Sequence, residues 1–344
     1  WGGRKPGPAP GMEPAPRVFA GGPRFFLYVR VPALAYFRIS SYTFSVCGRC
    51  GMKGVVLVNA YYQTDEIMYQ PRRLKEEFAA LGAELDILSA EAFPFCVEGG
   101  GLRSALTEYD FLIFWDKDKY LLAAAEAAGM PVFNGYRGVT TCDDKMLTFL
   151  ALADRGIPMP KTLPGLLCYR PEKHVLSAAA DRVEAEFGYP LIVKESYGSL
   201  GRGEYLVRDR AELLSVMEEV RLKPHLFQEF IAESAGRDLR VIVVGERVLG
   251  GMVRRSAGDF RSNLARGGSA EAFPVDEKTA ALAVRIAHIL DLDYCGIDFL
   301  FGKEGLTVCE VNSNAFFLGF EKTTGVNVAK CYAEHVLRKL SVRG

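Results

Sequence analysis

Residues 52 to 140 alternate between short apolar runs and longer stretches in which apolar positions recur at helical spacing. Helical spacing extends over about 65–81 and 120–128, and each stretch is followed by a glycine, Gly82 or Gly129. The intervening apolar runs, which predict strands, are 55–59, 84–88, 109–115 and 130–134. Alternation of strands and helices is typical of a parallel sheet with crossover helices. The pattern therefore predicts a small parallel α/β domain over residues 52–141.

Beyond residue 141 the pattern changes. The segment TTCDDKMLTFLALADRGIPMPKT (140–162) predicts a helix that begins at a Thr or Asp N-cap and ends at Gly-Ile-Pro. Short apolar runs joined by tight turns follow, in the order PLIVKES, EYLV, HLFQEFI, LRVIVVG and RVLGGMVRR. Further helices are expected at about 209–222, 276–291 and 326–340. This part predicts an α+β domain with antiparallel hairpins, so the whole chain combines α/β and α+β parts.

The first 51 residues differ in composition from the rest. They contain 7 of the 17 prolines of the chain, seven Lys or Arg and a single acid, Glu13. Arg30 and Arg38 interrupt the apolar stretch at 24–44, which therefore falls short of the roughly 18 apolar residues of a membrane-spanning helix. We expect Met52 to be the natural start and residues 1–51 to be a translated upstream extension or a disordered tail. A metal or redox role for the Cys47-x-x-Cys50 pair in this segment is not favoured.

The charges of the chain balance, with 42 Lys and Arg against 42 Asp and Glu. No broad basic field therefore points to a nucleic acid or to an acidic membrane as partner. The eight cysteines lack the spacing of a disulfide framework, which indicates a reducing, cytoplasmic setting.

A glycine-rich link, KESYGSLGRGE (194–204), joins two of the predicted strands. Gly198, Gly201 and Gly203 would let backbone N–H groups approach an anion, because no Cβ obstructs them. The link is not a Walker A loop, since strands stand on both sides of it. A flexible hairpin connection is the alternative. Lys194 lies in the apolar strand before the link, where a buried ammonium needs an anion such as phosphate. Lys145, before a predicted helix, is a second candidate. For both lysines the alternative is an ordinary solvated side chain.

Polar residues interrupt an otherwise apolar hairpin, CGIDFLFGKEGLTVCEVNSN (295–314). If Lys303-Glu304-Gly305 form a three-residue loop, Gly302 pairs with Leu306 and Asp298 lies opposite Glu310. Asn312 then faces the same side, opposite Gly296. Two carboxylates about 5 Å apart repel unless a cation lies between them, and oxygen ligands suit Mg²⁺ completed by water and phosphate. The alternative is an exposed sheet face with scattered acids, but the other face is apolar: Ile297, Phe299, Phe301, Cys309 and Val311.

The polar loop DFRSNLARGGSA (259–270) offers Arg261, Asn263 and Arg266. Arginines in such a loop can hold a carboxylate or phosphate through two parallel hydrogen bonds. An ordinary surface loop is the alternative.

Taken in order, these segments resemble the ATP-grasp superfamily and, within it, the RimK-type α-L-glutamate ligases. The resemblance extends over about residues 52–340 and includes Lys145, Lys194, the glycine link, FQEFI, GRDLRVIVVG, GDFRSNLARGG, GIDFL, CEVNSN and FEKTTG. It implies a Rossmann-like pre-ATP-grasp domain at 52–141. An ATP-grasp domain of two α+β subdomains, with a boundary near residue 230, would occupy 142–344.

The resemblance also implies roles for individual residues. Lys145 and Lys194 would contact the nucleotide phosphates, Glu229 and Phe230 the adenine edge, and Asp238 the ribose. The full implied ATP-binding set is Lys145, Lys194, Gly198, Gly201, Gly203, Gln228, Glu229, Phe230, Asp238, Arg261, Ser262 and Asn263. The implied catalytic residues are Arg261, Asn263 and Arg266. Asp298, Glu310 and Asn312 match the ligands of Mg²⁺ or Mn²⁺, with two ions expected.

The implied reaction is an ATP-dependent joining of a carboxylate to an amine through an acyl phosphate. L-glutamate or a similar amino acid would supply the amine, and a small molecule or a protein C-terminus the carboxylate. After Glu310-Val-Asn312 the chain departs from the RimK pattern, with SNAFFLGFEKTTG in place of a Ser-Pro-Gly segment, so the acceptor stays open. Two alternatives also stay open: a ligase acting on a carrier protein or cofactor with another amino acid, and a non-catalytic nucleotide-binding regulator. A homo-oligomer is expected.

Overall fold

A computed structural model of the chain describes residues 51–93, 95–104, 106–199, 201–256, 258–262 and 268–343. The predicted extension at 1–51, apart from Gly51, and the Cys47/Cys50 pair lie outside the described residues, as do Asn263 and Arg266. Within the described part, no helix combines the length and the apolar character needed to cross a bilayer.

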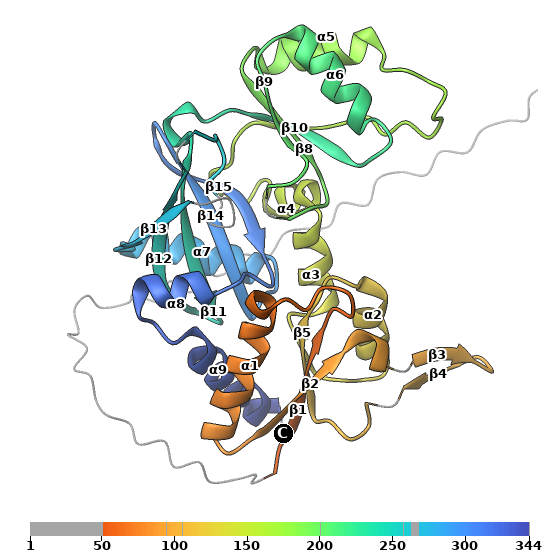
Figure 1. Cartoon of the computed structure of the whole chain (residues 1–344), viewed down its shortest axis with the longest axis vertical. Helices are drawn as coiled ribbons and strands as arrows, with labels where there is room; N and C mark the ends of the chain where they lie inside the picture. Colours follow the sequence, from red (N-terminus) through yellow and green to blue (C-terminus); the bar gives the residue numbers. More distant parts are fainter. Residues whose placement is uncertain are drawn as a thin grey trace, which may run out of the picture. The chain divides into compact units, whose positions relative to one another are not determined.

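A four-stranded parallel sheet forms the first part of the described chain, in the order β2-β1-β5-β6 (Figure 1). Its strands are β1 (Lys53–Val58), β2 (Glu84–Ser89), β5 (Phe111–Trp115) and β6 (Val132–Phe133). Its helices are α1 (Asp65–Ala80), α2 (Lys119–Ala127) and α3 (Tyr136–Asp143). The predicted parallel α/β arrangement is confirmed. The pattern missed the small hairpin of β3 (Phe95–Glu98) and β4 (Gly101–Ser104), and it also missed α3.

A second sheet, antiparallel, has the order β7-β10-β8-β9. It consists of β7 (Thr162–Pro164), β8 (Leu191–Glu195), β9 (Glu204–Val207) and β10 (His225–Glu229). The helices α5 (Ser177–Phe187) and α6 (Arg210–Val220) pack on it and share one apolar core with it. The helix α4 (Lys145–Leu152) precedes this sheet and begins at Asp144, which accepts hydrogen bonds from the amides of Met146 and Leu147. The predicted Asp N-cap is therefore confirmed.

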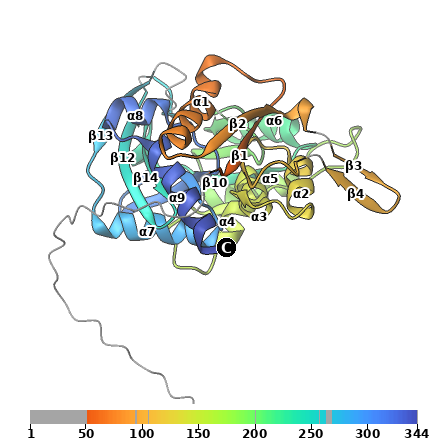
Figure 2. The same ribbon diagram turned by 90° about the horizontal axis from the view of Figure 1, so that it is seen from below.

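A third sheet has five antiparallel strands in the order β13-β12-β11-β14-β15. Its strands are β11 (Arg237–Val244), β12 (Arg247–Arg255), β13 (Ser269–Phe273), β14 (Tyr294–Gly302) and β15 (Gly305–Asn312). On one face it packs against α7 (Glu277–Ile289), and on the other against α8 (Leu318–Thr324) and α9 (Val328–Arg343). Figure 2 shows α9 beside α1 and the third sheet. Two short 3₁₀ helices, Ala90–Ala92 and Ala232–Ser234, complete the described elements.

The β14–β15 hairpin corrects one detail of the sequence prediction. Gly302 pairs with Gly305, so the connection is Lys303-Glu304 and not the predicted three-residue loop. A β-bulge between Asp298 and Phe299 then shifts the register by one residue, and Asp298 still pairs with Glu310 and Gly296 with Asn312. The predicted facing of the two acids is thus confirmed. The same bulge places Val308 in the core in place of Cys309, which was wrongly predicted to lie on the apolar face.

Candidate active site

Two adjoining cavities lie where the three sheets meet. The larger, of about 710 Å³, is lined by the strand ends of the parallel sheet, the glycine-rich link, the β14–β15 hairpin and the segment after it. The smaller, of about 80 Å³, is lined by β8, β10, β11 and the loop around Phe260. Both cavities share the side chains of Glu204, Arg254, Asp298 and Glu310. The carboxylates of the hairpin therefore stand at the junction of a small and a large chamber.

Asp298 is buried and held by two arginines. Arg240 donates to both of its oxygens, from Nε at 2.7 Å and from Nη2 at 2.6 Å, and Arg254 Nη2 lies 2.9 Å from Oδ2. Burial alone would raise the pKa of the Asp298 carboxyl, but the guanidiniums of Arg240 and Arg254 lower it below its usual value. Asp298 is thus an ionised carboxylate at neutral pH, with most of its lone pairs already used.

Glu310 is the less constrained acid of the pair. About a quarter of its side chain is exposed (26%), and its oxygen Oε1 lies 3.5 Å from Lys145 Nζ. The amide nitrogen of Asn312 is buried without a hydrogen-bond partner in the described structure. The two orientations of an Asn amide occupy the same space, so turning the amide by 180° would place its oxygen at that position.

The donor chemistry of these residues fits a hard divalent cation. Among the described residues, no group of three or more His, Cys, Asp and Glu side chains is arranged to hold a metal ion. Glu310, Asp298 and the Asn312 amide are oxygen donors of the kind that Mg²⁺ takes, and Mg²⁺ usually keeps several waters and phosphate oxygens. The residues present would therefore form part of a shell that water and a phosphate complete.

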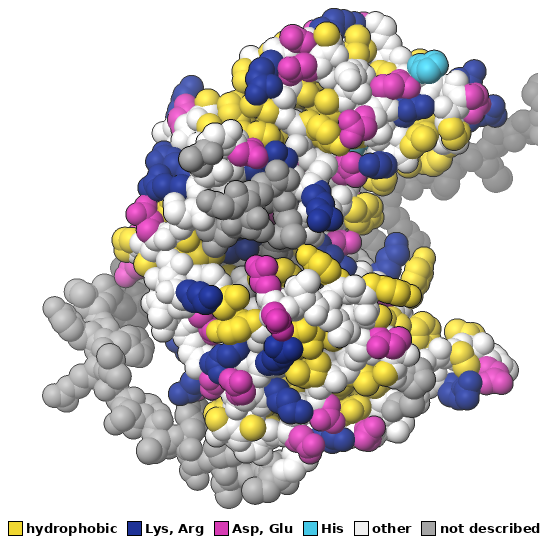
Figure 3. Space-filling view, viewed as in Figure 1, with side chains coloured by type: hydrophobic (Ala, Val, Ile, Leu, Met, Phe, Trp, Pro, Cys, Tyr) yellow, Lys and Arg dark blue, Asp and Glu magenta, His cyan; other side chains and the backbone are white. Residues whose placement is uncertain are grey.

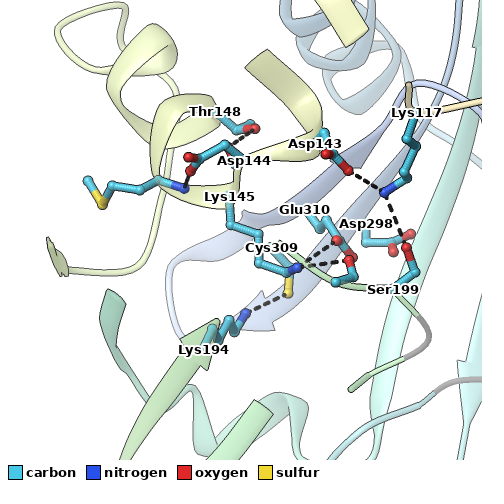
Figure 4. Close-up of polar contacts among 12 residues, drawn as sticks. Lys117, Asp143, Asp144, Lys145, Thr148, Lys194, Ser199, Asp298, Cys309 and Glu310 are labelled. Atoms are coloured by element: carbon cyan, nitrogen blue, oxygen red, sulfur yellow. Dashed lines mark hydrogen bonds and ion pairs between the residues drawn. The ribbon is translucent and has the colours of Figure 1, made fainter. Parts of the chain in front are cut away.

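Both predicted phosphate lysines are buried, each about 5% exposed, so the alternative of ordinary solvated lysines is wrong. Lys145 Nζ donates to the carbonyl oxygen of Gly198 at 3.2 Å. Figure 4 shows its contact to Glu310. Lys194 Nζ lies 3.6 Å from Cys309 Sγ, and Lys194 pairs across the sheet with Glu204. Burial would lower the pKa of Lys194, but Cys309 and the acids Glu204 and Glu310 raise it above its usual value. Lys194 is therefore an ammonium directed at the junction of the cavities.

The glycine-rich link connects β8 and β9, an antiparallel pair. Gly198, Gly201 and Gly203 all have positive φ, at 144°, 69° and 69°. A Cβ on Gly203 would lie 2.8 Å from the Glu195 side chain, so a larger residue does not fit there without movement. Gly198 and Gly201 line the larger cavity, as expected of a loop that approaches an anion.

The remaining predicted nucleotide residues line the smaller cavity: Gln228, Glu229, Phe230, Asp238, Arg261 and Ser262. Gln228 is buried and donates to Thr162 Oγ1 at 3.0 Å. Asp238 accepts two hydrogen bonds from Arg254 and one from Ser262. Arg261 forms an ion pair with Asp259 at 2.8 Å and donates to the carbonyl of Gly201 at 2.9 Å. The structure thus brings these residues together, and their nucleotide contacts stay predictions.

Sequence reasoning missed several residues of the site. Arg240 and Arg254, which hold Asp298, lie on β11 and β12 within apolar runs. The argument that a buried strand lysine needs an anion applies equally to these arginines, so a signal was present. Asn59 and Asp116, by contrast, are joined only by the fold: they follow β1 and β5 and form a hydrogen bond of 3.2 Å at the carboxyl ends of the parallel strands.

Charges of both signs are interspersed over the face shown in Figure 3, without a broad patch of a single sign. The lysines and arginines described above line the two cavities.

Comparison with known proteins agrees with this geometry. A family model described as a RimK-like ATP-grasp domain matches residues 142–336, more than half of the chain. The chain therefore belongs to the RimK-like ATP-grasp family, and the predicted family and ATP-grasp fold are confirmed.

Two curated relatives illustrate the similarity. β-citrylglutamate synthase B of Danio rerio is 37% identical over 232 residues, which cover 66% of this chain and 56% of that protein. A probable α-L-glutamate ligase of Halorhodospira halophila (strain DSM 244 / SL1) is 36% identical over 221 residues, covering 63% of this chain and 70% of that protein. The chain thus spans less than two thirds of the length of the Danio rerio protein.

A solved structure supports the fold alone. The ATP-grasp ligase PsnB in complex with a minimal precursor, Mg and ADP superposes with a TM-score of 0.60 at 20% identity. The match covers 83% of this chain and 97% of that one.

Proposed function

We propose that this chain is an ATP-dependent carboxylate–amine ligase, with L-glutamate or a similar amino acid as the amine. The observation that carries the proposal is the opposed pair Asp298 and Glu310 at the junction of the two cavities, with the buried ammoniums of Lys145 and Lys194 beside it. Ionised acids and ammoniums concentrated in one place suit a metal–triphosphate. The names of the relatives, a β-citrylglutamate synthase and a probable α-L-glutamate ligase, support this class of reaction.

In the proposed reaction the carboxylate oxygen of the acceptor attacks the γ-phosphorus of ATP and releases ADP. The amine then attacks the acyl carbon, loses a proton and expels inorganic phosphate, so an amide bond replaces the acyl–oxygen bond. Lys145 and Lys194 would hold the phosphates in line, and the small cavity with Gln228, Glu229 and Phe230 would take the base. Arg240 would keep Asp298 in place.

A divalent cation held by Glu310, Asp298 and Asn312 would supply neutralisation of phosphate charge during transfer. Mg²⁺ is the proposed ion, and the solved PsnB complex contains Mg and ADP. Two ions, and Mn²⁺ as an alternative, belong to the same proposal, as do a homo-oligomeric state and a cytoplasmic location.

Thermal unfolding with nucleotide tests the binding step. Mg²⁺ with ATP should raise the melting temperature of the wild-type protein, and Glu310→Gln should remove most of the shift. No shift in the wild type would count against nucleotide binding as a whole.

An acceptor screen tests the chemistry. ADP should form only when a carboxylate and an amine are both supplied, and the mass of the product should equal their sum less one water. The screen combines each amino acid with small di- and tricarboxylates, with peptides and with cell lysate. If no combination releases ADP while Mg–ATP still binds, the non-catalytic regulator is the better description.

A further inference from the structure

Lys117 makes a contact that none of the roles above explains. It follows β5 by two residues, in the connection to α2, and lines the larger cavity. Its Nζ lies 2.7 Å from Asp143 Oδ1 and donates to Ser199 Oγ at 3.2 Å, as Figure 4 shows. Ser199 belongs to the glycine-rich link. One ammonium therefore joins the end of the parallel sheet to that link, across 82 positions of sequence.

The position of Asp143 is fixed by the same helix junction that positions Lys145. Asp143 is the last residue of α3, and the next residue, Asp144, caps the first turn of α4, which Lys145 opens. The Lys117–Asp143 pair is partly buried, with side chains 35% and 22% exposed. The ammonium is thus held by a fixed carboxylate and directs its remaining hydrogen-bonding capacity at Ser199.

Two lysines hold consecutive residues of the link. Lys145 donates to the carbonyl of Gly198, and Lys117 to the hydroxyl of Ser199. If Lys145 turns to a nucleotide phosphate, as proposed above, its bond to Gly198 is weakened or lost. Lys117 then still holds Ser199, while Arg261 holds the carbonyl of Gly201 further along the link.

We propose that Lys117 is a positioning residue that acts through Ser199 to hold the glycine-rich link over the larger cavity while the acyl phosphate exists. The inference rests on the proposed ligase function. An acyl phosphate is lost if water reaches it before the amine does, so a link that is held closed favours amide formation over hydrolysis. Lys117 touches no reacting atom in this scheme.

The first experiment measures the ratio of ADP formed to amide formed by the full chain, with the acceptor and amine that the screen identifies. The wild-type ratio should be close to one, and Lys117→Met and Ser199→Ala should each raise hydrolysis about tenfold, the effect of losing one charged hydrogen bond. Lys117→Arg should restore coupling, because a guanidinium can also reach Asp143 and Ser199. Lys119→Met is the matched control: Lys119 is exposed and its ammonium lies over the Tyr120 ring. An unchanged ratio in Lys117→Met, or an equal rise in Lys119→Met, overturns the proposal.

The second experiment needs no turnover. An arginine-specific protease should cleave after Arg202, an exposed residue of the link, and the fragments are read by mass. Cleavage of Lys117→Met and Ser199→Ala should be about tenfold faster than that of the wild type, both without ligand and with Mg²⁺ and a non-hydrolysable ATP analogue. Equal rates in all four proteins, Lys119→Met included, refute the role of Lys117. If the wild type makes no amide but these rates differ as expected, the ligase function fails and the positioning of the link stands.

Discussion

At the scale of single residues, the two acids of the hairpin have unequal surroundings. Asp298 is 4% exposed and receives hydrogen bonds on both oxygens from Arg240, with Arg254 close to Oδ2. In the described part of the chain, the one ion pair of Glu310 is with Lys145, whose Nζ lies 3.5 Å from Oε1. Asp298 therefore organises the fold around the site, while Glu310 retains free lone pairs for a ligand.

This difference predicts unequal losses of stability from two isosteric changes. Asp298→Asn should lower the free energy of unfolding by about 3 kcal/mol, because it leaves the buried guanidinium of Arg254 without one of its carboxylates. Glu310→Gln should change it by less than about 1 kcal/mol, since the side chain is partly exposed. Urea unfolding without nucleotide measures both values. Equal losses in the two variants would show that Glu310 is as structural as Asp298.

At the scale of elements, the sequence predicted most of the strands, and its failures have definite causes. The apolar periodicity of β14 and β15 is compatible both with a three-residue loop and with a two-residue connection followed by a bulge, because either arrangement sets Asp298 opposite Glu310. Periodicity therefore predicted the facing acids but not the residue that the bulge moves, Cys309. The loop at 259–270 concealed β13, whose sequence SAEAF is only weakly apolar.

No local sequence pattern could have predicted the structural role of Asn134, which connects several elements. Asn134 follows β6 with a φ of 56°, and its amide contacts the start of β14 and the segment after β15. Its Oδ1 accepts from the amides of Asp293 and Tyr294 at 2.8 and 3.0 Å, and its Nδ2 donates to the carbonyls of Tyr294 and Ser313. These partners are about 160 to 180 positions away in sequence, so only the tertiary fold identifies them.

Removing this side chain should destabilise the protein and loosen the hairpin. Asn134→Gly should lower the free energy of unfolding by about 3 kcal/mol, because it leaves buried backbone groups without partners, while glycine tolerates the positive φ. Asn134→Ala should cost about 1 kcal/mol more, from backbone strain. Hydrogen exchange at the amides of Asp293 and Tyr294 should accelerate in both variants. Unchanged exchange at these two amides would contradict the assignment.

The contacts of α9 with Asp293, the residue before β14, should make the free energy of unfolding depend on pH. Asp293 Oδ1 lies 2.7 Å from His335 Nε2 and 2.5 Å from Lys339 Nζ. Burial opposes ionisation, but these hydrogen bonds lower the pKa of the Asp293 carboxyl below its usual value. A depressed pKa contributes stability above the unfolded-state pKa, near 4, and this contribution is lost as the pH falls through the folded-state pKa.

Asp293→Asn should therefore be about 2 kcal/mol less stable than the wild type at pH 7, and the gap should shrink as the pH falls from about 5 to 3. Urea unfolding at a series of pH values measures the gap. A gap that stays constant, or widens in acid, would mean that the carboxylate form of Asp293 is not what stabilises this contact.

At the scale of the whole molecule, one apolar core contains residues from both sides of the predicted domain boundary at residue 141. One apolar cluster contains Phe78 of α1, Trp115 of β5, Tyr294 of β14 and Tyr332 of α9. The rings of Trp115 and Tyr294 lie 5.4 Å apart. A separate cluster lies between the second sheet and the helices α5 and α6. From this packing we infer two cooperative units: one combines the parallel sheet with the third sheet and α9, and the other is the second sheet. The predicted domain boundary at residue 141 stays a prediction.

Two substitutions that shorten core side chains distinguish these cooperative units from the predicted domains. Phe78→Ala should cost about 4 kcal/mol and accelerate hydrogen exchange in β14 and α9 as well as in β1, because all three contact the core that Phe78 helps to fill. Leu213→Ala on α6, equally buried, is the matched control: it should accelerate exchange in β8 and β10 and leave β1 and β14 protected. If Phe78→Ala affects only β1, β2 and β5, the parallel sheet is an independent unit and the boundary at residue 141 is also a boundary of folding. If exchange rises in α9 as well, the cavity of about 710 Å³ is lined by parts that fold together, and the parallel sheet contributes to the site as a fixed wall.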